Sequence, residues 1–174
     1  MRRVRYAVAM SLDGYIAGPN GEYDWIDMDP DIDFQALMNQ FDTFLVGRRT
    51  YEGIVSNPSG GMAPGIKLVV FSRTLKQQNH PDVTIVSENA KEAVDSLRRQ
   101  KGKDIALYGG GDLFRSLLSL GVVDTVEVSV IPFLLGGGIP LLPSPAQRAQ
   151  LSLTCHQVYS KTGTVILEYA VKRG

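Results

Sequence analysis

Three short segments that follow apolar runs carry residue types that bind phosphate. Residues 47–50 (GRRT) follow TFLV, residues 72–74 (SRT) follow LVVF, and residues 109–112 (GGGD) follow IALY. Arginine guanidinium groups bind phosphate through several N–H donors, and a glycine-rich turn at a helix start lets backbone amides approach an anion closely. If the apolar runs are parallel strands, their carboxyl ends lie along one edge of a sheet, where ligands bind in α/β folds. The spacing therefore predicts a phosphate site, in outline a dinucleotide site, at that edge.

The glycine triplet at residues 109–111 has two interpretations. Three consecutive residues without side chains mark either a tight turn between strand and helix or a surface that a ligand approaches closely. The segment GGGDLF is not a good Rossmann fingerprint, because it lacks the third glycine, occurs late in the chain and is not followed by an acidic residue at the end of the next strand. The joint order of the arginine and glycine segments, rather than the triplet alone, favours a nucleotide site.

Composition narrows the class of protein and of partner. The 174 residues suit one domain, residues 1–174, that needs no disulfide or metal to fold. Eighteen basic and eighteen acidic residues cancel, which argues against nucleic acid or an anionic membrane as a partner. Cys155 cannot form an internal disulfide and, with only His80 and His156 beside it, leaves no ligand set for zinc, so no metal is expected. No apolar run reaches about 18 residues, and we therefore expect a soluble cytoplasmic protein.

The elements that must position these segments alternate between strand and helix. Apolar runs predict strands at residues 4–10, 43–47, 66–72, 83–86, 104–108 and 125–131, and helical spacing predicts helices within 29–41, 48–55, 87–100 and 112–121. Asn89 is the predicted N-cap of the third helix, with Glu92 three residues later. The tail, residues 151–173, predicts two strands about a turn containing Thr162 and Gly163. This alternation predicts an α/β fold with a mostly parallel sheet and an antiparallel C-terminal edge.

The order of these motifs resembles the dihydrofolate reductase superfamily. The segments that carry the resemblance are SLDGYIA after the first strand, then LVGRRTYE, VVFSRT and LYGGGDLF. The SLDG loop and the later VDTVEVSVIPFLLGGGIPLL are more similar to the branch that contains the reductase domain of bifunctional riboflavin-biosynthesis deaminase-reductases. The resemblance covers essentially the whole chain. It implies a dihydrofolate-reductase-like three-layer α/β/α fold, with a mostly parallel mixed sheet, and NADPH-dependent hydride transfer to a small pteridine- or pyrimidine-type heterocycle.

The resemblance also implies which positions bind the cofactor. Arg48 and its neighbours match the segment that grips the cofactor phosphates, and Ser72 with Arg73 match the pocket of the adenosine 2′-phosphate. Because a 2′-phosphate requires local positive charge, NADPH is preferred over NADH. Asp112 has a second interpretation, as a carboxylate that favours a helix N-terminus. The implied cofactor positions are Ala9, Ile16, Gly47, Arg48, Arg49, Thr50, Ser72, Arg73, Gly109, Gly110, Gly111, Asp112 and Leu113.

The expected catalytic residues are two carboxylates, Asp31 and Asp13. Hydride transfer to a C=N or C=O carbon develops negative charge on the heteroatom, so the site needs a proton source or a carboxylate that binds an amino-pyrimidine edge. Asp31 lies closest to the spacing of the superfamily's active-site carboxylate, with Asp33 as the alternative; Asp13 matches a pocket position of the riboflavin branch. Each has a structural alternative, as a helix N-terminal carboxylate or a turn residue. Trp25 and Ser129 are expected to contact the substrate, and the alternatives for them are core packing and a half-polar strand.

For the substrate, the activity and the oligomeric state, the sequence leaves a second interpretation open. Dihydrofolate reductases carry an arginine that binds the folate glutamate where this chain has Ile66, so folate itself is not expected. A ribose-phosphate pyrimidine competes with a pterin, and the phosphate would require a basic residue for which only Lys67 and Lys161 are candidates. A non-catalytic nucleotide-binding or regulatory module is the alternative to an enzyme. We expect a homodimer, and the apolar segment GGGIPLLPSP is either buried under the sheet or hidden between two copies.

Overall fold

The computed structural model describes residues 1–57 and 65–173, and every element named below lies within those ranges. The strands are β1 (Val4–Ser11), β2 (Tyr15–Ala17), β3 (Phe41–Gly47), β4 (Lys67–Phe71), β5 (Thr84–Val86), β6 (Asp104–Gly109), β7 (Thr125–Ile131), β8 (Ile139–Pro140), β9 (Leu151–Tyr159) and β10 (Thr164–Val171). The helices are α1 (Phe34–Met38), α2 (Arg48–Ser56), α3 (Ala90–Arg99) and α4 (Gly111–Ser119), with a 3-10 turn, η2 (Gln77–Asn79). None of the described helices has the length and apolar character needed to cross a bilayer.

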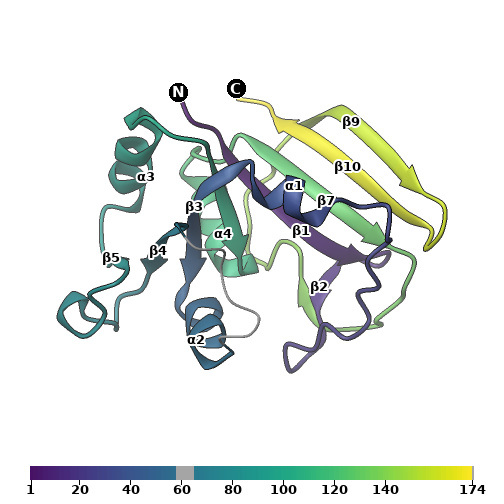
Figure 1. The fold of residues 1–174 in the computed structure, drawn as a ribbon, viewed down its shortest axis with the longest axis horizontal. Helices are drawn as coiled ribbons and strands as arrows, with labels where there is room; N and C mark the ends of the chain where they lie inside the picture. The colour runs from purple at the N-terminus through teal and green to yellow at the C-terminus, as the bar shows by residue number, and fades with distance from the viewer. Residues whose placement is uncertain (58–64, 174) are drawn as a thin grey trace.

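The main sheet has the strand order β5-β4-β3-β6-β1-β7-β10-β9, and β2 pairs with β8 in a separate ribbon (Figure 1). The strands from β5 to β7 are parallel to one another, whereas β10 is antiparallel to both β7 and β9. The predicted mixed sheet with an antiparallel C-terminal edge is therefore confirmed. Because the parallel strands share one direction, their carboxyl ends lie along a single edge.

Two hydrophobic clusters cover opposite faces of the sheet. Leu45 of β3 packs on one face with α3 and α4, while Phe44 and Val46 pack on the other face with Tyr51 of α2. Successive side chains of a strand point to opposite faces, so one buried strand supplies both clusters. The expected three-layer α/β/α arrangement follows from this alternation.

Local details differ from the sequence-based expectation in three places. Helix α1 spans only five residues, because Asp33 caps it at the start and Phe41 already pairs with Asp104 in the β3–β6 ladder. Asn89 is the N-cap residue of α3 but makes no side-chain capping bond, since its backbone is left-handed with φ of 53° and not extended. The β2–β8 ribbon was not predicted, because strands of three and two residues are too short to show a sequence period.

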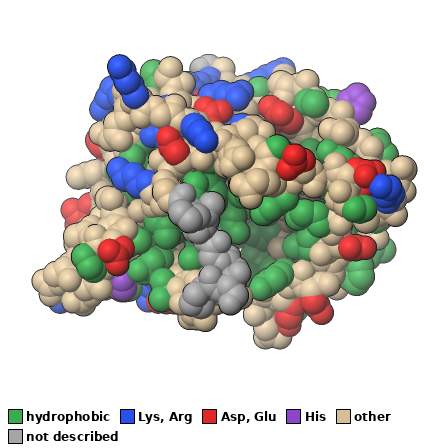
Figure 2. All heavy atoms as spheres, in the orientation of Figure 1, with side chains coloured by type: hydrophobic (Ala, Val, Ile, Leu, Met, Phe, Trp, Pro, Cys, Tyr) green, Lys and Arg blue, Asp and Glu red, His purple; other side chains and the backbone are tan. Residues whose placement is uncertain are grey.

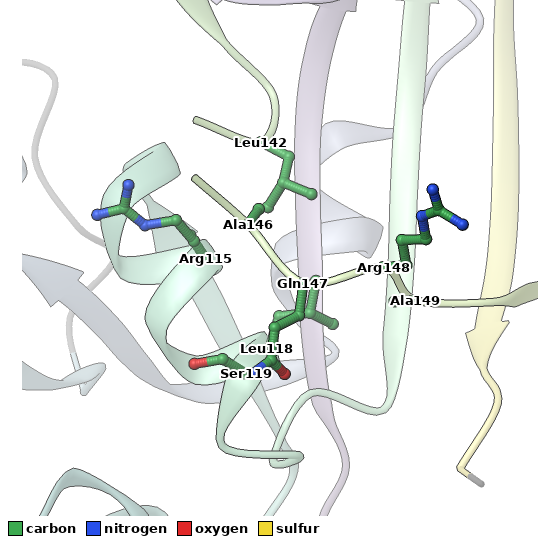
Figure 3. Close-up of a pocket in the computed structure, with 8 residues that line it drawn as sticks. All are labelled: Arg115, Leu118, Ser119, Leu142, Ala146, Gln147, Arg148 and Ala149. Carbon is green, nitrogen blue, oxygen red and sulfur yellow. The ribbon is translucent and has the colours of Figure 1, made fainter. Parts of the chain in front are cut away.

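The segment GGGIPLLPSP packs against its own chain. Leu141 and Leu142 lie against the core cluster that contains α4, and a Cβ at Gly111 would lie 2.9 Å from Pro143 Cγ. Burial within the chain, the first of the two alternatives for this segment, thus accounts for its leucines. A pocket of about 40 Å³ lies between α4 and residues 142–149 (Figure 3), which has room for only a water molecule or two.

Candidate active site

The three phosphate-type segments meet on adjacent strand ends. In the sheet register Gly47 at the end of β3 lies opposite Phe71 at the end of β4, and Val46 lies opposite Gly109 at the end of β6. Residues 47–50, 72–74 and 109–112 therefore leave the sheet side by side, in the spatial order β4, β3, β6. The convergence predicted from the sequence is present in the fold.

Two helices begin at this edge without a side-chain cap. Gly47 and Gly110 are the N-cap residues of α2 and α4, and neither can offer a side-chain acceptor to the first-turn amides. Thr50 of α2 lies between the two helix starts: a Cβ at Gly109 would lie 3.4 Å from Thr50 Oγ1, and one at Gly110 would lie 4.0 Å from it. First-turn amides without capping acceptors, combined with two converging helix dipoles, suit an anion.

Arg48 connects the start of α2 to the segment after β4. Its Nη1 donates to Thr74 Oγ1 at 3.1 Å, and Ser72 Oγ lies 3.3 Å from the same hydroxyl. The Arg48 side chain is 45% exposed, and its Nε lies 3.7 Å from Glu52. Arg49 and Arg73 are exposed at the same strand ends. The edge thus presents three guanidinium groups and two hydroxyls within one neighbourhood.

The glycine triplet has separate causes along its length. Gly111 is required by the chain itself, because the atoms nearest to an added Cβ include Pro140 O at 3.0 Å in addition to Pro143. At Gly110 the nearest group to an added Cβ is Thr50, at an ordinary contact distance. The peptide bond between Gly109 and Gly110 is cis. Packing against Pro140 and Pro143 therefore explains Gly111, and close approach of a ligand to the triplet stays a prediction.

The residues beside the triplet point away from the strand ends. The Asp112 carboxylate lies 3.2 Å from Arg115 Nη2 in the next turn of α4. Asp112 also lies in the first turn of that helix, the position at which a carboxylate favours the helix dipole. Leu113 packs against the core beneath α4. At Asp112 and Leu113, only the backbone amides are thus placed toward the strand ends.

The strands β1 and β7 and the loop of residues 22–33 form a second, aromatic part of the site. Ala9 and Ser129 lie opposite each other in the β1–β7 register, and both are half-buried. The ring centroids of Trp25 and Phe133 are 6.2 Å apart. Figure 2 shows hydrophobic side chains gathered around a hollow on this face, between α2 and β2 of Figure 1. Flat apolar walls beside a sheet edge that carries phosphate-binding residue types suit a ligand with an aromatic heterocycle.

Tyr108 adds an aromatic side chain beside the glycine triplet. Tyr108, the last side chain of β6 before the glycine triplet, packs on Phe44 with ring centroids 5.1 Å apart. Burial raises the pKa of the Tyr108 phenol, and the neighbouring Tyr23 phenol raises it further.

Asp13 holds two loops together. Its Oδ1 accepts hydrogen bonds from Ser11 Oγ at 2.7 Å and from Leu135 N at 3.1 Å, and its Oδ2 accepts one from Gly136 N at 2.7 Å. The Ser11 hydroxyl, followed by these backbone amides, lowers the pKa of the Asp13 carboxyl group. Ile16 lies nearby in β2, the ribbon that continues from this loop. The contacts of Asp13 are those of a carboxylate that positions loops.

The carboxylates of the 22–33 loop have different partners. Asp33 Oδ1 accepts from Ala36 N at 2.9 Å, which is the helix-capping alternative for this residue. Asp31 Oδ1 accepts from Lys161 Nζ at 2.6 Å in an exposed ion pair. Asp31 therefore remains available at the surface of the loop, whereas Asp33 is part of α1.

Asp29 is a buried residue of this loop that the sequence analysis missed. It is 1% exposed, and its Oδ2 accepts from both Thr162 N at 2.9 Å and Thr162 Oγ1 at 3.1 Å. Burial opposes its ionisation, but hydrogen bonds from Asp31 N and Thr162, with the nearby Lys161, lower its pKa overall. Only the turn-type pair Asp29–Pro30 marks the position in the sequence. This contact ties the loop that carries Trp25 to the turn between β9 and β10.

Comparison with known proteins gives the family. The model of the RibD C-terminal domain matches residues 2–167. The Bacillus subtilis (strain 168) protein YyaP is 37% identical over 179 residues, which cover 97% of this chain and 94% of that protein. A solved protein of Shewanella sp. PV-4, named for riboflavin biosynthesis, is 26% identical with a TM-score of 0.81, and the match covers 98% and 99% of the two chains.

A dihydrofolate reductase shares the fold. The enzyme of Enterococcus faecalis, solved in complex with NADP(H), has a TM-score of 0.69 at 17% identity, with 98% of this chain and 97% of that one covered. The sequence resemblance to the riboflavin branch is therefore confirmed, and the expected dihydrofolate-reductase-like fold is confirmed with it. This chain belongs to the RibD C-terminal domain family.

Proposed function

We propose that this protein is an NADPH-dependent reductase that transfers hydride to a small pteridine- or pyrimidine-type heterocycle. The observation that carries the proposal is the pair of uncapped helix starts, α2 and α4, on neighbouring strand ends beside Arg48. Membership of the RibD C-terminal domain family supports an oxidoreductase activity. The arginines and helix starts of the site favour NADPH as its cofactor.

The residues at the strand ends fit a dinucleotide with an extra phosphate. Arg48 and Arg73, with the Ser72 and Thr74 hydroxyls between them, offer charged and neutral donors to a 2′-phosphate. The first-turn amides of α4 and α2 suit a pyrophosphate, and the absent side chain at Gly110 leaves its backbone accessible to it. When bound, NADPH supplies the hydride.

The remaining residues would hold the heterocycle and exclude water. Small side chains at Ala9 and Ser129 leave space for a flat ring over β1 and β7, and the Ser129 hydroxyl can accept a hydrogen bond from a ring amine. Trp25 and Phe133 would cover that ring on the side of the loop. Holding both reactants in one geometry is the protein's main contribution to such a reaction.

We propose that Asp31 delivers the proton that must reach the substrate heteroatom. Asp13 accepts hydrogen bonds from Ser11, Leu135 and Gly136 that hold two loops together, so we assign it to loop positioning within the same site. Asp31 is exposed, and its ion pair with Lys161 is a surface contact that a substrate can replace. The hydride then reduces the ring carbon while the proton neutralises the heteroatom.

Ligand-dependent melting and turnover test this function. NADPH at about a hundred times its dissociation constant should stabilise the fold by about 2.7 kcal/mol. Oxidation of NADPH, followed by its absorbance, should then depend on a dihydropteridine or an aminopyrimidine riboside. Stabilisation by NADPH without turnover of any of these compounds would favour the non-catalytic nucleotide-binding module, and the absence of both would contradict the proposal.

The expected homodimer is also a proposal, and β9 is the surface that favours it. β9 is an outer strand of the sheet, and its Leu151, Leu153 and Val158 are 38%, 52% and 65% exposed. The strand sequence LSLTCHQVY contains no Asp, Glu, Lys or Arg, although edge strands are usually protected by charge or proline. Antiparallel pairing of β9 with β9 of a second copy is self-complementary about a two-fold axis.

A further inference from the structure

The loop that covers the proposed heterocycle site carries an unusual concentration of negative charge. Between Arg5 and Arg48 the chain contains no Lys, Arg or His. Residues 22–33 alone contain six carboxylates, and all of them except Asp29 are exposed. The acidic residues of this loop are Glu22, Asp24, Asp27, Asp29, Asp31 and Asp33.

Several contacts place this acidic loop at the site and not elsewhere on the surface. Trp25, between Asp24 and Asp27, packs against Phe133, which follows β7 at the same sheet edge. Asp29 is tied to Thr162 in the turn between β9 and β10, which also lies at that edge. Figure 2 shows Asp and Glu side chains along the lower and right-hand rim of the hollow.

The two basic candidates for binding a substrate phosphate, Lys67 and Lys161, do not offset this charge. Lys161 is the only Lys or Arg in the segments that form this wall, residues 11–14, 22–33, 129–136 and 159–164. Its ammonium group, paired with Asp31 at 2.6 Å, offsets at most one of the six carboxylates of residues 22–33. Lys67 begins β4 and therefore lies at the opposite edge of the sheet.

The charge is divided between the two halves of the site. Arg48, Arg49 and Arg73 lie at the ends of β3 and β4, on the side proposed for the cofactor phosphates. The carboxylates lie on the side of β1, β7 and β10, which is proposed for the heterocycle. A phosphate group attached to the substrate would meet like charge there, and charges of one sign across a cleft disfavour a ligand of the same sign.

We propose that the substrate is a heterocycle without a phosphate group, neutral or positively charged, and that the acidic loop rejects phosphorylated analogues. This inference rests on the proposed reductase function, whose substrate class it narrows. Discrimination of this kind acts by repulsion of the wrong ligand and not only by attraction of the right one.

A matched pair of compounds tests this inference. 5-Amino-6-ribosylaminouracil and its 5′-phosphate differ only in the phosphate, and kcat/KM for each is measured with saturating NADPH. We expect at least a tenfold preference for the unphosphorylated compound at low ionic strength. The preference should shrink toward 1 M salt, because the Debye length falls to about 3 Å there.

Two variants connect the preference to the loop. The double change Asp24→Asn with Asp27→Asn removes two charges beside Trp25 and should reduce the preference several-fold. Asp82→Asn, which removes a charge just before β5 at the far end of the sheet, should leave the preference unchanged. A preference that responds equally to both changes would reflect net charge only and would contradict a role of the loop.

Calorimetric binding of the same two compounds to the protein with NADP⁺ separates this inference from the proposed function. Equal or tighter binding of the 5′-phosphate would overturn the inference even if both compounds were reduced. Tighter binding of the unphosphorylated compound without turnover would support the charge selectivity of the cleft while contradicting the reductase.

Discussion

The Arg48 guanidinium group donates a hydrogen bond to Thr74 Oγ1 at 3.1 Å, so the first turn of α2 is joined to the segment that leaves β4. The two residues are separated by 26 positions in the sequence and belong to neighbouring strand ends. This contact positions a cation where the proposed 2′-phosphate would bind, while other N–H donors of the same guanidinium group remain available to a ligand.

Arg48→Ala should weaken NADPH binding much more than NADH binding. A hydrogen bond to a charged group contributes about 1.5–3 kcal/mol, which corresponds to roughly a 10- to 150-fold loss of affinity for the phosphorylated cofactor. Fluorescence titration with both cofactors measures the difference. Arg99→Ala, at the end of α3 and at the opposite edge of the sheet, is the control and should change neither affinity. An equal loss for both cofactors would withdraw the 2′-phosphate assignment from Arg48.

Gly111→Ala should destabilise the fold. Its Cβ would lie 2.9 Å from Pro143 Cγ and 3.0 Å from the backbone oxygen of Pro140, so the 140–143 segment must move. Overpacking of this kind costs about 1–3 kcal/mol, and each kcal/mol lowers Tm by roughly 2–4 °C in a protein of this size. Thermal unfolding followed by circular dichroism measures the change.

The matched control for this change is Gly53→Ala in α2. Within residues 1–57 and 65–173, and apart from the neighbouring backbone of α2, no atom lies within 4 Å of an added Cβ at Gly53. Alanine gains up to about 1 kcal/mol over glycine inside a helix. Its Tm should therefore stay equal or rise. If Gly111→Ala also left Tm unchanged, the triplet would not be explained by packing of the 140–143 segment.

Asp13→Asn should lower stability at neutral pH and have little effect in acid. Because the folded-state pKa of Asp13 lies below its unfolded value, the carboxylate stabilises the fold above the unfolded pKa of about 3.9. This contribution is lost as the pH falls through the lower, folded-state pKa, where the wild-type group is itself protonated. Urea unfolding at several pH values tests this. Asp24→Asn, at an exposed position for which the described chain shows no hydrogen bond to the carboxylate, is the control. A pH-independent difference would contradict the linkage.

Asp31→Asn should lower kcat while leaving NADPH affinity intact. General acid catalysis typically contributes a factor of about 10² to 10⁴, and asparagine cannot supply the proton. Rapid-mixing measurements of hydride transfer, together with NADPH titrations of the same variant, separate the two effects. Asp33→Ala, which removes the side-chain cap of α1, should change stability more than kcat. Full turnover by Asp31→Asn would mean that the proton comes from solvent.

Val158→Lys should convert a dimer into a monomer. The side chain is 65% exposed on β9, so lysine should not disturb the isolated fold but would place two like charges at a two-fold interface. Light scattering after size exclusion measures the mass, with Lys91→Glu on exposed α3 surface as the control. A wild-type protein that is monomeric at high concentration would contradict the proposed interface.

The sequence by itself determined the alternating elements and the location of the phosphate-type segments. Strands such as β3 and β6 are continuous apolar runs followed at once by GRRT or GGGD, so their identity depends on local pattern. Parallel strand direction then follows from the helices between them, and with it the meeting of Gly47 and Gly109 at one edge. These are properties of short windows of sequence.

Tertiary structure alone decided the contacts between distant segments. The burial of Asp29 by Thr162, the close packing of Pro143 on Gly111 and the short β2–β8 ribbon each join residues far apart in the chain. No local period or propensity encodes such a pairing, because its energy depends on which surfaces the folded sheet brings together. The separation of basic and acidic residues arises in the same way: the sequence contains both sets of charges, and the strand order places them toward different ends of one sheet edge.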